Sequence, residues 1–159
     1  MTHPELLARV MVEACVDSIE GALASERVGA GRVELCGLGV GGTTPSFGLM
    51  AQCRERLRIP MHVMIRPREG NFEYSGDEFE TMLKDIKATR SARADGVVFG
   101  ILKSDETIDE VRMRVLIEAA RPMRVACHRA FDATPNASEA LDTLLRLEVD
   151  LVLTSGHAA

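Results

Sequence analysis

The pattern Glu-x-Cys occurs twice near the start of the chain, as Glu13 with Cys15 and as Glu34 with Cys36. Each copy lies in a short run of β-branched and other apolar residues, which is typical of a β-strand. Alternate residues of a strand point to the same face, so each carboxylate shares a face with its thiol. Carboxylates transfer protons and thiolates bind soft metal ions, so the two copies are the first candidates for chemistry.

Two later apolar runs add polar side chains of a kind that active sites use. In residues 61–67, His62 and Arg66 share one face, and in residues 124–130 the alternation makes His128 the better candidate for the same face. Arginine holds anionic groups, and an imidazole or a carboxylate moves protons. The residues that such a catalytic site would use are Glu13, Glu34, Arg66 and His128. The alternative is a layer of ion pairs inside the fold, because buried carboxylates are costly unless they are paired.

A glycine-rich stretch, GLGVGG, follows the second Glu-x-Cys at residues 37–42. It lacks both G-x-G-x-x-G and G-x-x-x-x-G-K-[ST], so a nucleotide site is weakly supported. Backbone freedom in a tight connection explains it better, with Thr44 and Pro45 predicted to open the next helix. The N–H groups of Gly41 and Gly42 would still be placed to meet an anion at that helix start.

Six apolar runs are predicted to be strands, and helical segments with their own start signals follow nearly all of them. The runs cover residues 10–16, 32–36, 61–67, 95–102, 124–130 and 150–156. Ser75 with Glu78 and Asn136 with Glu139 are the clearest helix starts, and Asp17 or Ser18 caps the first helix. The side chains predicted to face the core from the later helices are Phe79, Met82, Leu83, Ile86, Leu141, Leu144 and Leu145.

Strands that alternate with amphipathic helices every 20 to 35 residues or so indicate βα units and a parallel sheet. A faint repeat, in which an apolar run ends in glycine, favours a (β/α) barrel over a doubly wound sheet. No linker divides the sequence. We therefore expect one α/β domain over residues 1–159, with the polar strand ends gathered at the C-terminal mouth of the barrel, where barrel active sites lie.

Composition excludes several classes of function. The 159 residues carry 19 basic and 24 acidic side chains, for a net charge of -5, with 4% aromatic residues and no tryptophan. This balance offers neither a basic surface nor a stacking platform, so we expect no nucleic-acid partner. No apolar run reaches the length of a membrane span, and the first residues do not resemble a secretory signal, so we expect no membrane association.

The four cysteines, at positions 15, 36, 53 and 127, form no C-x-x-C pair. In a chain without a secretory signal they are expected to be reduced thiols, and the location is expected to be cytoplasmic. Free cysteines usually pack as small buried hydrophobic residues, which is the alternative to a metal site at Cys15 and Cys36. Cys53 and Cys127 are expected to be such packing residues.

The segments VELCG, GVGGTTPS, VMIRPR, ADGVVFG, HRAFD and VLTSG occur in this order between about Met11 and Gly156. In combination they closely resemble the CutC family, long called copper homeostasis proteins. The resemblance implies a TIM barrel, a cytosolic location and the handling of copper. Carried over residue by residue, the copper ligands proposed for the family are Cys15 and Cys36. The polar residues of the family's barrel mouth correspond to Glu13, Glu34, Arg66, His128 and Asp132.

The sequence also departs from the family pattern. A family chain continues through two more βα units, whereas about six are present here, so we expect an incomplete barrel. Open edges at its first and last strands favour association between copies of the chain. Arg93 and Glu148 stand where glycine usually ends a helix, at a cost of about 1 kcal/mol each in a left-handed conformation.

Three functional hypotheses remain open at this stage. The first is a CutC-type copper homeostasis protein that binds Cu(I) through Cys15 and Cys36, since a soft ion prefers soft sulfur and tolerates few ligands. The second is a barrel enzyme that acts on a small polar or anionic substrate, for which copper is incidental. The third is a non-functional fragment of a longer barrel.

Overall fold

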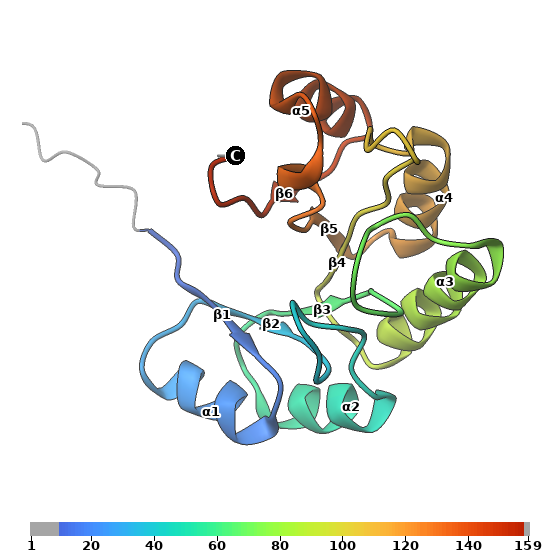
Figure 1. The fold of residues 1–159 in the computed structure, drawn as a ribbon. Coiled ribbons are helices and arrows are strands. Elements are labelled where there is room, and N and C mark those ends of the chain that lie inside the picture. Colours follow the sequence, from blue (N-terminus) through green and yellow to red (C-terminus); the bar gives the residue numbers. More distant parts are fainter. Residues whose placement is uncertain (1–9, 158–159) are drawn as a thin grey trace, which may run out of the picture.

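The computed structural model describes residues 10–157, which form one curved parallel sheet with helices on its outer side (Figure 1). The remaining residues of the predicted 1–159 domain lie outside the described part. The elements are β1 (Glu13–Val16), α1 (Ile19–Arg27), β2 (Arg32–Leu35), α2 (Phe47–Arg56), β3 (Met61–Met64), α3 (Gly76–Ser91), β4 (Gly96–Phe99), α4 (Glu110–Ala120), β5 (Arg124–Cys127), η1 (Phe131–Ala133), α5 (Ala137–Arg146) and β6 (Leu151–Val152).

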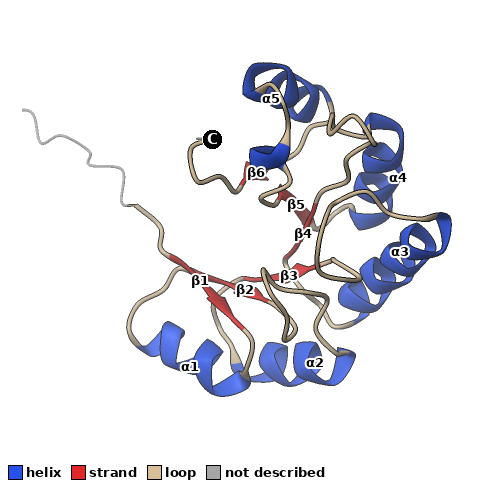
Figure 2. Cartoon of the chain, in the orientation of Figure 1, coloured by secondary structure: helices blue, strands red, loops and turns tan. Residues whose placement is uncertain are grey.

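The six strands are hydrogen-bonded in sequence order, and every pair is parallel. The sheet curls as it proceeds, so the strands line the concave side of a half-barrel and the helices follow one another around the outside (Figure 2). The predicted α/β class and incomplete TIM barrel are therefore confirmed. Each strand falls within its predicted run but is shorter, because the chain turns early into the loops at the mouth.

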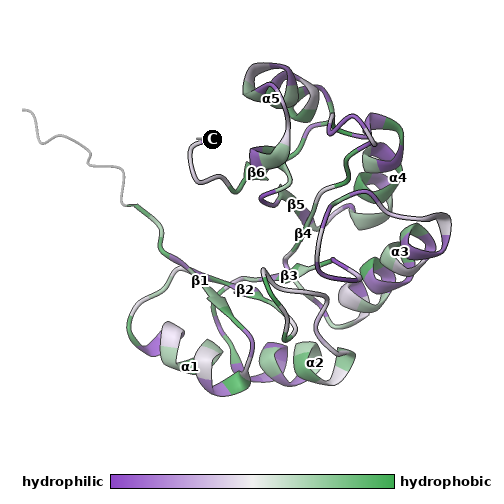
Figure 3. Ribbon diagram, in the orientation of Figure 1, coloured by the Kyte–Doolittle hydropathy of each residue, from purple (hydrophilic) through white to green (hydrophobic). Residues whose placement is uncertain are grey.

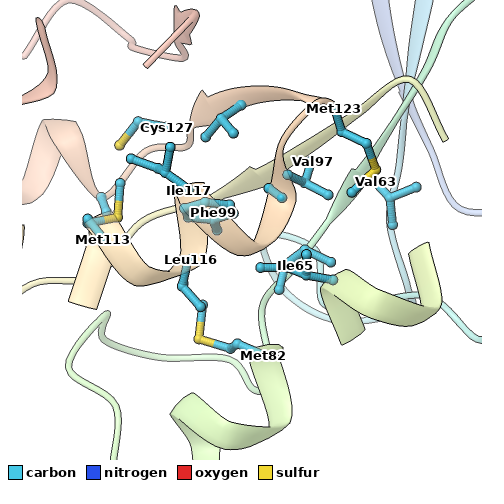
Figure 4. Close-up of a cluster of buried hydrophobic side chains, with 14 of the residues drawn as sticks. Val63, Ile65, Met82, Val97, Phe99, Met113, Leu116, Ile117, Met123 and Cys127 are labelled. Carbon is cyan, nitrogen blue, oxygen red and sulfur yellow. The ribbon is translucent and has the colours of Figure 1, made fainter. Parts of the chain in front are cut away.

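The main hydrophobic core lies between the sheet and the helices. Alternate residues enter it, among them Val63 of β3 with Ile65 just after this strand, and Val97 and Phe99 of β4, all fully buried. Figure 4 shows these side chains meeting Met82 of α3 and residues of α4. Burial of such side chains stabilises a fold by roughly 1.5–3 kcal/mol each, so this layer fixes the curvature of the strands and the position of their ends.

The opposite face of the strands forms a smaller cluster inside the half-barrel. It consists of Cys36, Met64, Val98 and Ala126, with Leu151 packed against them. The predicted alternation is thus confirmed, because residues of one parity enter the helical layer and residues of the other parity line the interior. Buried Cys53 and Cys127 belong to the helical layer, as expected for packing residues.

Acidic residues at the start of two strands join neighbouring strands. Asp95 accepts a hydrogen bond from the backbone N–H of Met61 at 2.8 Å, and Asp150 accepts one from Val125 at 2.8 Å. Each carboxylate also pairs with an arginine of an adjacent helix or its end, as the Asp95–Arg54 pair shows. These contacts fix the positions of neighbouring strands relative to one another at the N-terminal end of the sheet.

The helix starts match the sequence prediction except in one case. Ser18 caps α1, Ser75 and Glu78 form a capping box on α3, and Asn136 caps α5. The predicted start at Thr44 is wrong, because Ser46 caps α2. The Thr44 hydroxyl instead accepts a hydrogen bond from the backbone N–H of Arg66 at 2.9 Å, which ties this residue to the loop after β3.

One predicted core face is also partly wrong. In α5, Leu144 is buried, whereas Leu141 is 42% and Leu145 is 63% exposed. The buried face runs through Ala140, Leu144 and Leu147, which follow an i, i+4, i+7 spacing. The two exposed leucines lie on a neighbouring face of the helix. Phe79, Met82, Leu83 and Ile86 of α3 pack against the core as predicted.

The predicted left-handed residues at two helix ends are present, with φ of 59° at Arg93 and 56° at Glu148. The two edge strands carry exposed apolar side chains, such as Val12 before β1 and Leu153 after β6. Figure 3 shows the hydrophobic segment that leads into β1. Within residues 10–157, none of the helices has both the length and the apolar character that crossing a membrane requires.

Candidate functional site at the mouth of the half-barrel

The two predicted thiols meet at the C-terminal ends of β1 and β2. Cys15 pairs with Glu34 in the register of these strands, which places Cys36 two residues further on the neighbouring strand and on the same face. The two sulfur atoms lie 3.6 Å apart. Cys15 is exposed and Cys36 is buried, so the pair is reachable from one side and held by the interior on the other.

Contact between the thiols separates their pKa values. The hydrogen bond from Cys36 lowers the pKa of the Cys15 thiol, against the opposing effects of burial and of the Glu34 charge. The same contact raises the pKa of Cys36, and burial and the charge of Glu34 raise it further. Cys15 therefore loses its proton more easily than an ordinary thiol does, and Cys36 retains its proton. Losing both protons requires a positive charge nearby, which a metal cation provides.

Glu34 completes a group of three possible metal ligands. Its carboxylate oxygen Oε1 lies 3.7 Å from the Cys36 sulfur and accepts the thiol hydrogen bond. One ligand atom each from Cys15, Glu34 and Cys36 lies within 4.8 Å of the others. Burial and the charge of Glu13 raise the pKa of Glu34, against the weaker effects of the thiols and Arg32. Two sulfur donors beside one partly buried carboxyl fit a soft cation better than a hard one.

Glu13 is placed differently from the prediction that it shares a catalytic site with Glu34. Its carboxylate forms an ion pair with Arg32, its direct neighbour in the sheet register. Arg32 is buried, so Glu13 and Arg32 form an ion pair inside the fold. Such pairing was the alternative to a catalytic role for Glu13. Glu13 acts on the thiol site through its charge on Glu34 rather than through contact with the thiols.

A cavity of about 460 Å³ opens beside the thiols. Its polar wall comes from Cys15, Glu34, Arg66 and His128, which the sequence placed on the interior face of four different strands or their ends. The cavity has the size of a small-molecule site. A second cavity of about 210 Å³ lies against Cys15 and Cys36 themselves, so the thiols separate two hollows at the mouth.

Arg66 holds the mouth loops together. Its Nη1 donates hydrogen bonds to the carbonyl oxygens of Val40 at 3.0 Å and Gly42 at 2.9 Å, and its Nη2 donates to Gly70 at 2.8 Å. In the described part of the chain its guanidinium forms no ion pair with a carboxylate. Arg66 is buried, and therefore brings an uncompensated positive charge to the cavity wall.

His128 is a neutral hydrogen-bond donor on the same wall. Burial, helped by the charge of Arg66, lowers its pKa to about 3. The backbone N–H of Ala130 donates to Nδ1 at 3.2 Å, so the ring proton resides on Nε2. The ring lies against Phe72, with a distance of 4.8 Å between ring centroids.

Asp132 anchors a loop rather than facing the cavity. Its carboxylate accepts hydrogen bonds from the Thr154 hydroxyl at 2.5 Å and from the backbone N–H of Ser155 at 2.9 Å, and it pairs with Arg129 at 2.6 Å. Burial opposes ionisation, but these contacts outweigh it and hold the pKa of Asp132 below its usual range. The residue is poorly suited to accept a proton in catalysis.

The glycine-rich stretch is a turn, as the sequence favoured. Gly37 and Thr43 form an antiparallel bridge, and the N–H of Gly42 donates to the carbonyl of Gly39 at 3.1 Å. Gly42 has a φ of 77°, and an added Cβ would lie 2.9 Å from the Cys36 sulfur. Glycine at this position therefore lets the loop close over the thiol.

The sequence analysis did not single out two residues of the cavity wall. The Phe72 ring lies against His128 at an interplanar angle of 45°, and its centroid lies 5.3 Å from the Arg66 guanidinium carbon. Arg129 also lines the cavity while it pairs with Asp132. Phe72 is an isolated aromatic residue in the loop after β3, and no periodicity marks a loop residue. Arg129 is the neighbour of His128 in the predicted strand and was therefore expected to point to the opposite face, away from the interior.

Comparison with known proteins identifies related chains. The CutC family model matches residues 10–159. A CutC family protein of Mesorhizobium japonicum is 51% identical over 148 residues, which cover 92% of this chain and 57% of the relative. The human protein named copper homeostasis protein cutC homolog is 48% identical over 147 residues, which cover 92% of this chain and 54% of the relative. The chain thus spans a little over half the length of these relatives.

Solved structures agree with this relationship. A CutC copper homeostasis protein from Streptococcus agalactiae has a TM-score of 0.89 at 34% identity, over 94% of this chain and 74% of that one. A phosphoenolpyruvate phosphomutase from Streptomyces platensis has a TM-score of 0.65 at 16% identity, over 92% of this chain and 60% of that one. The second similarity concerns the fold alone.

Proposed function

Because the chain belongs to the CutC family, we propose that it is a copper homeostasis protein that binds Cu(I) through Cys15 and Cys36. The observation that carries the proposal is the 3.6 Å separation of the two sulfur atoms at the barrel mouth. Copper homeostasis is also the role named for the human and mouse relatives. Because those proteins are longer than this chain, their role is carried over to it only as part of this proposal.

The donor set suits this ion. Cu(I) is soft and accepts low coordination numbers, so two thiolates satisfy it and the oxygen of Glu34 is a weaker third partner. The positive charge of the ion offsets the cost of removing the second thiol proton from the Cys15–Cys36 pair. When bound, copper would be held at this pair as cargo that is stored or passed on.

The test is anaerobic titration of the reduced chain with Cu(I) against a competing chelator. We expect one copper per chain and sulfur scattering in the copper X-ray absorption spectrum. The Cys15→Ser, Cys36→Ser double variant should bind more than about 100-fold more weakly. A Cys53→Ala variant is the control, since Cys53 lies in the helical layer. Copper retained by the double variant would refute the proposal.

The proposed location is the cytoplasm. Cys15 is an exposed free thiol, and the cytoplasm keeps such thiols reduced. Alkylation of Cys15 with a thiol-trapping reagent in intact, rapidly quenched cells should modify it fully. Recovery of the chain with Cys15 oxidised would argue for another compartment.

A second candidate function is catalysis on a small polar or anionic substrate. The cavity of about 460 Å³ favours it, because Glu34, Arg66 and His128 converge on it from three strands or their ends. A metabolite screen with this chain and with a full-length relative tests the idea. Turnover that the Glu34→Gln variant abolishes, and that copper does not change, would support it. Turnover that requires copper would favour a single metal-centred site.

A further inference from the structure

His128, which lines the mouth cavity, carries a buried hydrogen-bond donor that has no acceptor. His128 is 3% exposed, and its Nε2 atom has no hydrogen-bond partner among residues 10–157. Because Ala130 fixes the proton on Nε2, this atom must donate. A buried donor without an acceptor costs free energy, so the site is incomplete until an acceptor occupies it.

Arg66 adds a charge to this donor. Three of its five N–H donors serve backbone carbonyls, and its Nε atom has no acceptor among the residues that the structure describes. Carbonyl oxygens satisfy hydrogen bonds but do not cancel the charge. The other arginine at the cavity, Arg129, is already paired with Asp132. The cavity therefore presents one unpaired positive charge and one neutral donor, together with the Glu34 carboxyl, whose pKa is raised by burial and by the charge of Glu13.

The remaining walls are apolar. Phe72 lies against His128 and under Arg66, and Met64 and Leu153 line the same cavity. An aqueous ion alone would leave these side chains without contacts. A ligand with an apolar body can pack against them while its polar group meets the two donors.

We propose that this cavity binds a small organic acid whose carboxylate accepts hydrogen bonds from His128 Nε2 and Arg66 and whose carbon skeleton packs on Phe72 and Met64. The proposal shares its site with the second candidate function, and it requires binding but no turnover. Neither donor belongs to the Cys15–Cys36 pair, but Cys15 lines the same cavity, so the binding test uses the copper-free chain.

A carboxylate fits this site better than a phosphate. A phosphate group carries up to two charges and three strong acceptor oxygens, which usually meet several N–H groups. Here one cation and one imidazole face the cavity. Two N–H groups of the glycine loop are already used, since Gly42 N–H is bonded within the turn and Val40 N–H donates to Glu69 at 2.8 Å.

The test uses 4-fluorobenzoate as the probe, with the reduced, copper-free chain and ¹⁵N-histidine labelling. Fluorine NMR should report binding, and the Nε2 resonance of His128 should shift during the titration. His62 is the internal control, because it is equally buried but does not line the cavity. The uncharged isostere 4-fluorobenzamide should bind at least about tenfold more weakly. Inorganic phosphate should bind more weakly than the carboxylate.

Two variants complete the design. His128→Phe keeps a ring against Phe72 but removes the donor, and it should weaken 4-fluorobenzoate binding about tenfold. The Cys53→Ala variant, altered in the helical layer, should bind the probe as the wild type does, and binding by the copper-free chain separates this site from the copper proposal. Equal binding of the benzoate and the benzamide, tighter binding of phosphate, or an unchanged His128 resonance would each overturn the proposal, even if His128→Phe did not fold.

Discussion

The sulfur atoms of Cys15 and Cys36 lie 3.6 Å apart although 21 positions separate them in the chain. The sheet register accounts for this proximity, because Cys15 is paired with Glu34 and Cys36 follows two residues later on the same face. The helix between the two strands, α1, lies on the outer side of the sheet (Figure 1). A single parallel βαβ unit, β1–α1–β2, thus suffices to build the candidate metal centre.

Glu34 is expected to tune copper binding rather than to determine it. Its carboxylate accepts the Cys36 thiol hydrogen bond, which places it at the edge of the sulfur pair. The Glu34→Gln variant should bind Cu(I) about tenfold more weakly, as loss of a supporting partner usually does. Either single cysteine variant should lose far more. Chelator competition checks both, and an effect of Glu34→Gln as large as that of Cys15→Ser would make Glu34 a principal ligand.

The sequence was sufficient to predict how the site is built from strands. Alternation in a parallel barrel places apolar residues towards the helices, so the polar members of each run had to face the interior. Cys36 and His128 are where this argument put them. The capping box at Ser75 and Glu78 was equally readable, because its two hydrogen bonds are local.

Pairing between strands could not be predicted in the same way. Glu13 meets Arg32 because the β1–β2 register sets them opposite each other, and a register is not visible in either strand alone. The family resemblance placed Asp132 at the barrel mouth, but it could not indicate that a loop more than 20 residues later provides its partners. Thr44 does not cap α2, because its hydroxyl accepts a hydrogen bond from the backbone N–H of Arg66. Contacts between residues far apart in the sequence thus determine the positions of Glu13, Asp132 and Thr44.

Asp132 is expected to stabilise the fold through its charge. Its side chain is 9% exposed and accepts hydrogen bonds from the loop after β6 while paired with Arg129. Asp132→Asn should therefore lower the free energy of unfolding by about 2 kcal/mol near neutral pH. Urea unfolding of both proteins measures the difference.

The pH dependence of this difference follows from the sign of the shift. The folded pKa of Asp132 lies below the unfolded value of 3.8, so its stabilisation is complete above pH 3.8. It is lost as the pH falls below that value towards the folded pKa. The gap between wild type and Asp132→Asn should narrow in this range, whereas a gap that stayed constant would mean that shape rather than charge is responsible.

Gly96 is expected to be required by His62 on the neighbouring strand. The two residues are paired in the β3–β4 register, and a Cβ at position 96 would lie 2.5 Å from the imidazole ring. His62 is fully buried and cannot move without displacing its neighbours. Gly96→Ala should destabilise the chain by about 1–3 kcal/mol, measured by denaturant unfolding.

A second glycine provides the matched control for this substitution. Gly48 lies in α2, and an added Cβ there would meet no atom within 4 Å. Gly48→Ala should stabilise the chain by up to about 1 kcal/mol, since alanine restricts the unfolded backbone. If both variants lost similar stability, the close approach of His62 to Gly96 would not be the cause.

The unpaired edge of β1 is expected to make the 159-residue chain associate with itself. Val12 is 60% exposed beside this edge, and an apolar edge strand is a template for pairing with another chain. A lysine at such a position prevents pairing because its charge would have to be buried. Val12→Lys should therefore reduce the concentration-dependent increase in sedimentation coefficient. Val111→Lys should not, since Val111 is an exposed valine on α4, away from the edge strand. A monomeric wild type at all concentrations, or equal effects of the two substitutions, would show that the edge is not an interface.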